Sequence, residues 1–225
     1  FEKIFGESPY KSPTDMGVNM AGFCITDNET CVKASGDEII RRYFKSLCDL
    51  KMGRVDVSAV NKIEMLMKQA GISPEDRAVV KSAFNRSEEN GGEPAVAIQL
   101  KDGRIVTGKT SPLLGPASAA LLNAVKALGG MERPVKMIEP EVIEPIQKLK
   151  TTVLGNSNPR LHSDEVLIAL SICANTSECA AIAISKLNEL RGCEAHSTVI
   201  LAQVDEDVYR KLGINLTCEP KYKTN

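Results

Sequence analysis

Polar side chains that can bind an anion or move a proton gather at two places, each directly before a predicted helix. Lys109 and Ser111 form the first group. The second group consists of Asn156, Asn158, Arg160 and His162. Because a helix N-terminus offers unpaired N–H groups and the positive end of the helix dipole, both groups predict a site for a phosphate or a carboxylate. The alternative is that the Asn-rich run is turn chemistry and that Arg160 is a solvated or ion-paired side chain.

The two histidines of the chain, His162 and His196, are the candidate catalytic residues. Histidine is the side chain that most readily gives or takes a proton at neutral pH. Ser197 follows His196 directly, but adjacent residues of a strand point to opposite faces, so the two do not form a nucleophile and its base. The alternative for each histidine is a structural role, at a helix cap for His162 and at a strand start for His196.

A third candidate group lies near the start of the chain, in a loop rich in Gly, Pro and polar residues. Asp15 and Asn19 are its main candidate ligand-binding residues. Such a loop can line a cleft. It can equally be an ordered linker that is held by turns in which Asn and Asp side chains bond the backbone.

The pattern of helix and strand signals changes at Asn90-Gly91-Gly92 and predicts two domains. Residues 1–90 carry apolar residues at helical spacing and predict a helical segment, part of a larger unit. Residues 91–225 alternate strands with helices and predict a layered domain. The predicted strands are 94–100, 105–107, 135–138, 198–202 and 214–217. An Asp102-Gly103 turn joins the first two strands into a hairpin.

This order predicts a three-layer α/β/α domain with a mixed sheet, and it resembles the cytidine-deaminase-like fold. The phrase from Asp102 to Gly108 is similar to the opening hairpin of that fold. The zinc deaminases of that fold place His, Cys and Glu at two helix starts. Here the corresponding helix starts contain Gly115-Pro116-Ala117-Ser118 and Asn158-Pro159-Arg160, with no such ligand set. The sequence therefore predicts no metal site and excludes zinc-dependent deamination.

Composition and charge exclude several classes of protein. Lys and Arg number 28 against 29 Asp and Glu, and there is no Trp, so the sequence predicts no nucleic-acid partner. No apolar run approaches the roughly 20 residues of a membrane span, so no membrane partner is expected. The seven cysteines show no CxxC spacing and predict buried thiols in a reducing compartment. The expected location is the cytoplasm.

Four phrases carry a resemblance to a known family. They are residues 12–23, 138–142, 155–163 and 194–198. Together they closely resemble an uncharacterised bacterial family, domain of unknown function 1846, over essentially the whole chain. The resemblance implies a protein of about twice this length, of which this chain is the C-terminal half. It also implies a Gly-rich, phosphate-loop-like stretch in the N-terminal half. Some members carry the label ATP-dependent peptidase, which these residues do not support.

Two hypotheses of function follow, and the family supplies no catalytic residues to decide between them. The first is an enzyme that binds a phosphorylated or nucleotide-like ligand in a cleft completed by the family's N-terminal half. The second is a non-catalytic module for assembly or scaffolding. The cofactor stays unknown, and a homo-oligomer is left open as a partner beside the N-terminal half. Convergence of the Asp15–Asn19 loop and the Asn156–His162 turn on one pocket would favour the enzyme.

Overall fold

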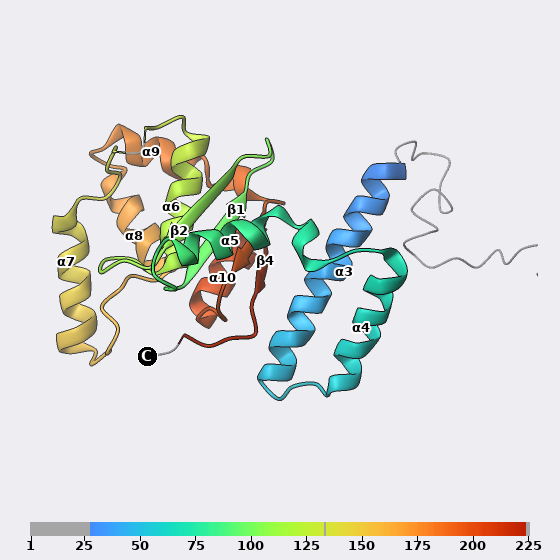
Figure 1. Cartoon of the computed structure of the whole chain (residues 1–225). Helices are drawn as coiled ribbons and strands as arrows, with labels where there is room; N and C mark the ends of the chain where they lie inside the picture. Colours follow the sequence, from blue (N-terminus) through green and yellow to red (C-terminus); the bar gives the residue numbers. More distant parts are fainter. Residues whose placement is uncertain (1–27, 133, 224–225) are drawn as a thin grey trace, which may run out of the picture. The chain divides into compact units, whose positions relative to one another are not determined.

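The computed structural model describes residues 28–132 and 134–223 (Figure 1). The chain divides into two compact units, Phe1–Arg77 and Ala78–Asn225. The change of pattern in the sequence predicts a boundary later, at residue 90. The helix between the two positions, α5 (Ala78–Glu88), packs against the sheet of the second unit.

The described part of the first unit is a helical pair followed by a single 3₁₀ turn. α3 (Asn28–Lys51) packs against α4 (Val57–Ala70), and η2 (Pro74–Asp76) follows. The N-cap of α4 is Asp56, whose carboxylate accepts the Ser58 N–H at 2.7 Å. Its C-cap is Gly71 with a φ of 64°, the left-handed conformation that glycine adopts without steric cost.

The second unit is built on a mixed sheet of four strands in the order β2-β1-β3-β4. The strands are β1 (Ala95–Gln99), β2 (Ile105–Lys109), β3 (Glu194–Ser197) and β4 (Asn215–Cys218). β1 is antiparallel to both β2 and β3, and β3 is parallel to β4. Thus β2, β3 and β4 run in one direction and end at the same edge of the sheet, which confirms the predicted mixed α/β class.

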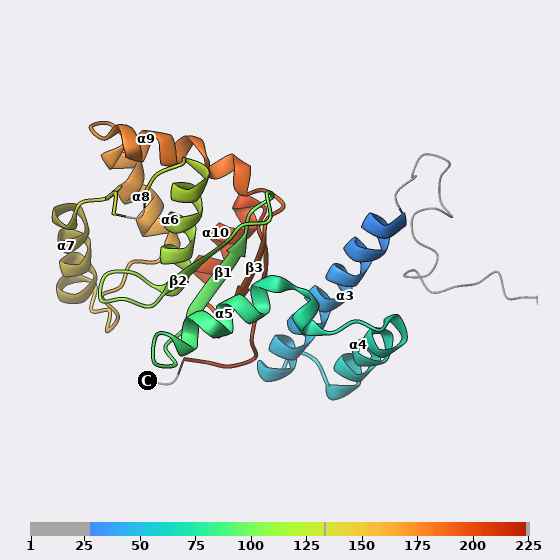
Figure 2. The same ribbon diagram turned by 45° about the horizontal axis from the view of Figure 1, so that its top comes forward.

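Helices cover both faces of this sheet (Figure 2). On β1, Ala97 packs with Val79 and Ala83 of α5. Its neighbours Val96 and Ile98 belong to the main core instead. Because successive side chains of a strand point to opposite faces, α5 and the main core lie on opposite sides of the sheet. The helices that build the main core are α6 (Pro116–Leu128), α8 (Ser163–Cys173), α9 (Glu178–Ser185) and α10 (Gln203–Leu212).

Two predicted strands are wrong. Residues 135–138 are irregular, with a bend at Met137 and Ile138, although these two side chains are buried. The Val135 carbonyl accepts a hydrogen bond from the Lys126 ammonium at 2.5 Å, so it is satisfied without a neighbouring strand. The segment leads into α7 (Pro140–Lys148) and then η3 (Leu149–Val153), a π-helix. The strand predicted at 198–202 lies four residues earlier, as β3, and His196 is inside it rather than at its start.

Candidate functional site

The N-termini of three helices meet at the edge of the sheet where β2 and β3 end. β2 leads to α6 and β3 leads to α10, while α8 begins between them. The Tyr209 hydroxyl of α10 donates to the Ala117 carbonyl of α6 at 2.9 Å. The Ser118 hydroxyl of α6 donates to the Leu161 carbonyl, directly before α8, at 2.9 Å. These bonds tie the start of α6 to the body of α10 and to the segment before α8.

The two polar groups predicted from the sequence are neighbours in space. The segments before α6 and α8 run parallel through a bridge between Leu114 and Leu161. The Leu161 N–H donates to the Leu113 carbonyl at 3.0 Å. The Nε of Arg160 donates to the Ser111 carbonyl at 2.8 Å, which joins one candidate residue of each group.

Arg160 is partly buried, and both its backbone and its side chain are held in place. Its N–H donates to the Asn158 side chain at 3.1 Å, in a turn of the kind expected for Asn before Pro. With Nε bound to Ser111, the two terminal nitrogens of the guanidinium have no hydrogen-bond partner within residues 28–132 and 134–223. The guanidinium is therefore a fixed donor that can bind an anionic group.

His162 forms a hydrogen-bonded pair with Asp205 of α10. Its Nδ1 lies 3.0 Å from Asp205 Oδ2, and its side chain is 30% exposed while that of Asp205 is 8% exposed. The bond to Asp205 raises the pKa of His162 above its ordinary value, against the opposing effect of burial. Because Nδ1 is bound to the carboxylate, Nε2 on the far side of the ring is left for another partner.

Asp205 also occupies the anion-binding end of α8. Its Oδ1 accepts the Ser163 N–H at 2.8 Å and the Ser163 hydroxyl at 2.6 Å. Burial would raise the pKa of Asp205, but the bonds from His162 and Ser163 outweigh it and hold that pKa below the ordinary value. Ser163 and Asp205 are thus first-turn residues of α8 and α10 that bond to each other, and His162 is the N-cap of α8.

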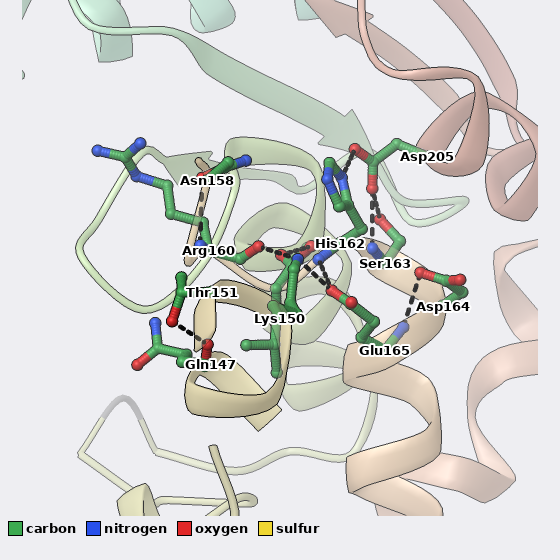
Figure 3. Close-up of polar contacts among 12 residues, drawn as sticks. Gln147, Lys150, Thr151, Asn158, Arg160, His162, Ser163, Asp164, Glu165 and Asp205 are labelled. Carbon is green, nitrogen blue, oxygen red and sulfur yellow. Dashed lines mark hydrogen bonds and ion pairs between the residues drawn. The ribbon is translucent and has the colours of Figure 1, made fainter. Parts of the chain in front are cut away.

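A buried lysine that the sequence analysis missed organises the turn before α8 (Figure 3). The Lys150 ammonium donates to the Arg160 carbonyl at 2.6 Å and to Glu165 Oε2 at 2.7 Å. The same Glu165 oxygen accepts the His162 N–H at 2.8 Å. The Lys150 carbonyl accepts the Asn156 N–H at 2.9 Å. Lys150, whose side chain is 4% exposed, thus binds both ends of the turn. It lies in the π-helix, a feature often found at functional sites.

His196 lies on the opposite face of the sheet from His162. It pairs with Ala97, which faces α5, and its ring lies 6.2 Å from that of Phe84 of α5. Its Nδ1 is 2.9 Å from the Thr217 hydroxyl, and its Nε2 is 3.2 Å from Glu219 Oε1. Full burial and these contacts are typical of a structural histidine. The two histidines do not share one pocket.

The remaining candidate residues are more dispersed. Lys109 is exposed at the end of β2, and Asn156 is exposed in the turn before α8. Asp15 and Asn19 lie outside the described residues, so convergence of their loop with the turn stays a prediction. In the described part of the chain, no group of three or more His, Cys, Asp or Glu side chains could hold a metal ion.

We expect the His162–Asp205 pair to make stability depend on pH near neutrality. The folded-state pKa of His162 is raised, so its contribution is complete below its unfolded pKa and is lost as the pH rises through the folded value. The free energy of unfolding of the wild-type protein should therefore fall between pH 6 and pH 8.5 by more than that of His162→Gln. Urea titrations at both pH values measure this difference. Equal falls in the two proteins would show that the pair contributes nothing.

Comparison with known proteins places this α/β chain in a family. The family models "Domain of unknown function DUF1846, N-terminal" and "Domain of unknown function DUF1846, C-terminal" match residues 1–71 and 75–225. The chain belongs to this family, as the sequence resemblance predicted. Because both models match, the chain contains residues of the N-terminal domain as well as the C-terminal one.

Curated relatives of the chain are named UPF0371 proteins. One from Streptococcus thermophilus is 56% identical over 222 residues, and one from Streptococcus pyogenes serotype M5 is 53% identical over 223 residues. Each alignment covers 99% of this chain but 45% of the relative. The chain therefore spans about half the length of the curated relatives it matches. Among the described helices, none combines the length and the apolar character that crossing a bilayer demands.

Proposed function

We propose that this chain is part of a cytoplasmic enzyme that binds a phosphorylated or nucleotide-like ligand at the edge where α6, α8 and α10 begin. Arg160 binds an anionic group of the ligand, and His162 gives or takes a proton. The rest of the longer family protein completes the cleft. The cytoplasmic location is supported by the free cysteines of the described residues, which are typical of a reducing compartment.

The observation that carries this proposal is the orientation of His162 by Asp205. A carboxylate that holds Nδ1 fixes the ring and stabilises the imidazolium, which is how a buried Asp supports a catalytic histidine. His162 is partly exposed, so its Nε2 can meet a ligand. The Lys150–Glu165 ion pair holds the backbone that leads into the histidine, through the Arg160 carbonyl and the His162 N–H. Such preorganisation is needed for general acid–base catalysis.

The geometry favours an extended ligand over a single small ion. Figure 3 shows the guanidinium of Arg160 and the imidazole of His162 apart from one another, with the Asn158 side chain drawn between them. The Ser163 N–H, where a small anion would bind the start of α8, is already bonded to Asp205. A ligand must therefore reach from Arg160 to His162 with separate groups. The likeness to the cytidine-deaminase-like fold plays no part in this proposal and stays a prediction about topology.

We expect Arg160→Ala to weaken a phosphorylated ligand by about 1.5–3 kcal/mol, the worth of a charge-assisted hydrogen bond. The test is a thermal-shift screen of the full-length family protein with AMP, ADP, ATP and inorganic phosphate, followed by titration calorimetry of any that raise the midpoint. Arg210→Ala is the matched control, since Arg210 is 75% exposed on α10 and pairs with Asp207. Equal losses in the two variants, or destabilisation by Arg160→Ala without any loss of binding, would contradict the assigned role.

An assembly module is the second candidate, because α8 carries an exposed apolar stripe. Ile168 and Ile172 lie one turn apart, and their exposed fractions are 60% and 57%. Contiguous exposed apolar surface is typical of an interface. In this case, sedimentation of the protein should show an oligomer that Ile168→Lys dissociates, while nucleotides and phosphate leave the thermal midpoint unchanged.

A further inference from the structure

The segment between α6 and α7 forms an apolar groove that the proposed function does not use. It has a volume of about 310 Å³. One wall is the face of α6 with Ala119, Leu122 and Lys126, which are spaced three or four residues apart and so share one side of the helix. The facing wall is formed by buried Met137, Ile138 and Ile143. Leu113 and Leu114 also line the groove.

Among the residues that the structure describes, the ammonium of Lys126 is held beside these apolar walls. Lys126 is partly buried, and its Nζ donates to the Val135 carbonyl at 2.5 Å, which holds the charge beside the groove. The other lysine of the lining, Lys136, is exposed and lies 3.8 Å from the Glu139 carboxylate. Burial lowers the pKa of Lys126 because it removes water from the ammonium.

From this arrangement we infer that the groove binds a small monocarboxylate with a hydrocarbon body. The carboxylate contacts the Lys126 ammonium, and the hydrocarbon chain lies along Leu122, Ile138 and Ile143. Charge complementarity selects an anion, and the apolar lining selects a hydrocarbon in place of a sugar or a polar chain. This site is separate from the proposed ligand site at His162.

The test uses the full 225-residue chain with octanoate as the probe and octan-1-ol as its uncharged counterpart. Calorimetry should show that the wild-type protein binds octanoate about tenfold or more tightly than octan-1-ol, as one charge-assisted hydrogen bond predicts. Methyl NMR should show shift changes at Leu122, Ile138 and Ile143. Equal affinity for the two probes, no octanoate binding, or shift changes confined to other methyl groups would overturn the inference.

Substitution of the lysine tests the assigned contact. Lys126→Met removes the charge and keeps an apolar side chain, so octanoate affinity should fall about tenfold or more while octan-1-ol affinity stays within about twofold. Lys136→Met is the matched control and should change octanoate affinity by less than about twofold, the effect of an exposed charge. An unchanged octanoate affinity in Lys126→Met would overturn the inference. If Lys126→Met fails to fold, the comparison of the two probes on the wild-type protein decides alone.

Discussion

Gly108→Ala is expected to destabilise the second unit by about 3 kcal/mol or more, the upper range for overpacking a core. Gly108 lies on β2 where α6 crosses the strand. A Cβ added there would lie 2.0 Å from the Ala120 nitrogen, 2.5 Å from the Pro116 carbonyl oxygen and 2.6 Å from the Ala120 Cα. All three are backbone atoms, so relief of the clash requires α6 to move away from the sheet. Such a movement would also displace the helix starts that hold the candidate site.

Gly115→Ala is the matched control for this substitution. Gly115 precedes the same helix, and a Cβ there would meet its nearest atom, the Leu161 carbonyl oxygen, at an ordinary 3.7 Å. We expect a cost of about 1 kcal/mol or less, the difference between Gly and Ala as an N-cap. Because the chain has two compact units, hydrogen exchange of the β1 and β2 amides is the measurement that reports on the second unit alone. Wild-type protection in Gly108→Ala would contradict the predicted close approach.

The elements that the sequence predicted correctly are those with local chemical signals. The Asp102-Gly103 turn supported a hairpin, and β1 and β2 are joined there, with Gly103 at a φ of 85° and the Asp102 carboxylate accepting the Arg104 N–H. The strand predicted at 135–138 is absent because of tertiary packing. Burial of Met137 and Ile138 gives an apolar run like that of a strand, but a lysine from α6 satisfies the backbone. Periodicity alone does not distinguish these cases.

The residues of the candidate site likewise fall into two groups, those with a local signal in the sequence and those without one. Arg160 and His162 were found because they precede a helix, which is a local feature. Asp205 lies 43 residues from His162 in the sequence. Lys150 lies in η3, ten residues before Arg160 in the sequence. Neither spacing nor composition indicates that these two residues meet the turn, because their partners are set by the packing of α8 against α10 and η3. The only signal was the opposite charge of the partners.

Asp205→Ala is expected to cost about 3 kcal/mol of unfolding free energy. The Asp205 carboxylate is buried, and it is the acceptor for the Ser163 N–H, the Ser163 hydroxyl and His162 Nδ1. Its removal leaves buried donors without a partner, which costs about 1–3 kcal/mol for each group. If the unpaired Ser163 hydroxyl causes most of this cost, Asp205→Ala should cost much less in a Ser163→Ala background. If the unpaired Ser163 N–H causes most of it, the cost should persist in that background. Urea unfolding of the four proteins of this double-mutant cycle distinguishes the two.

Asp205→Asn separates the structural role of the residue from its effect on His162. The amide oxygen can still accept from Ser163, so we expect a cost of about 1 kcal/mol, the net worth of an ordinary hydrogen bond. The amide NH₂ would then donate to His162 Nδ1, which requires the tautomer that carries its proton on Nε2.

The pKa of His162 should lose the upward shift that Asp205 causes, because a neutral amide does not stabilise the imidazolium. NMR titration of the His162 ring measures this. If the pKa of His162 in Asp205→Asn equals that of the wild-type protein, then Asp205 does not prepare the histidine for proton transfer, and the acid–base role proposed for His162 loses its support.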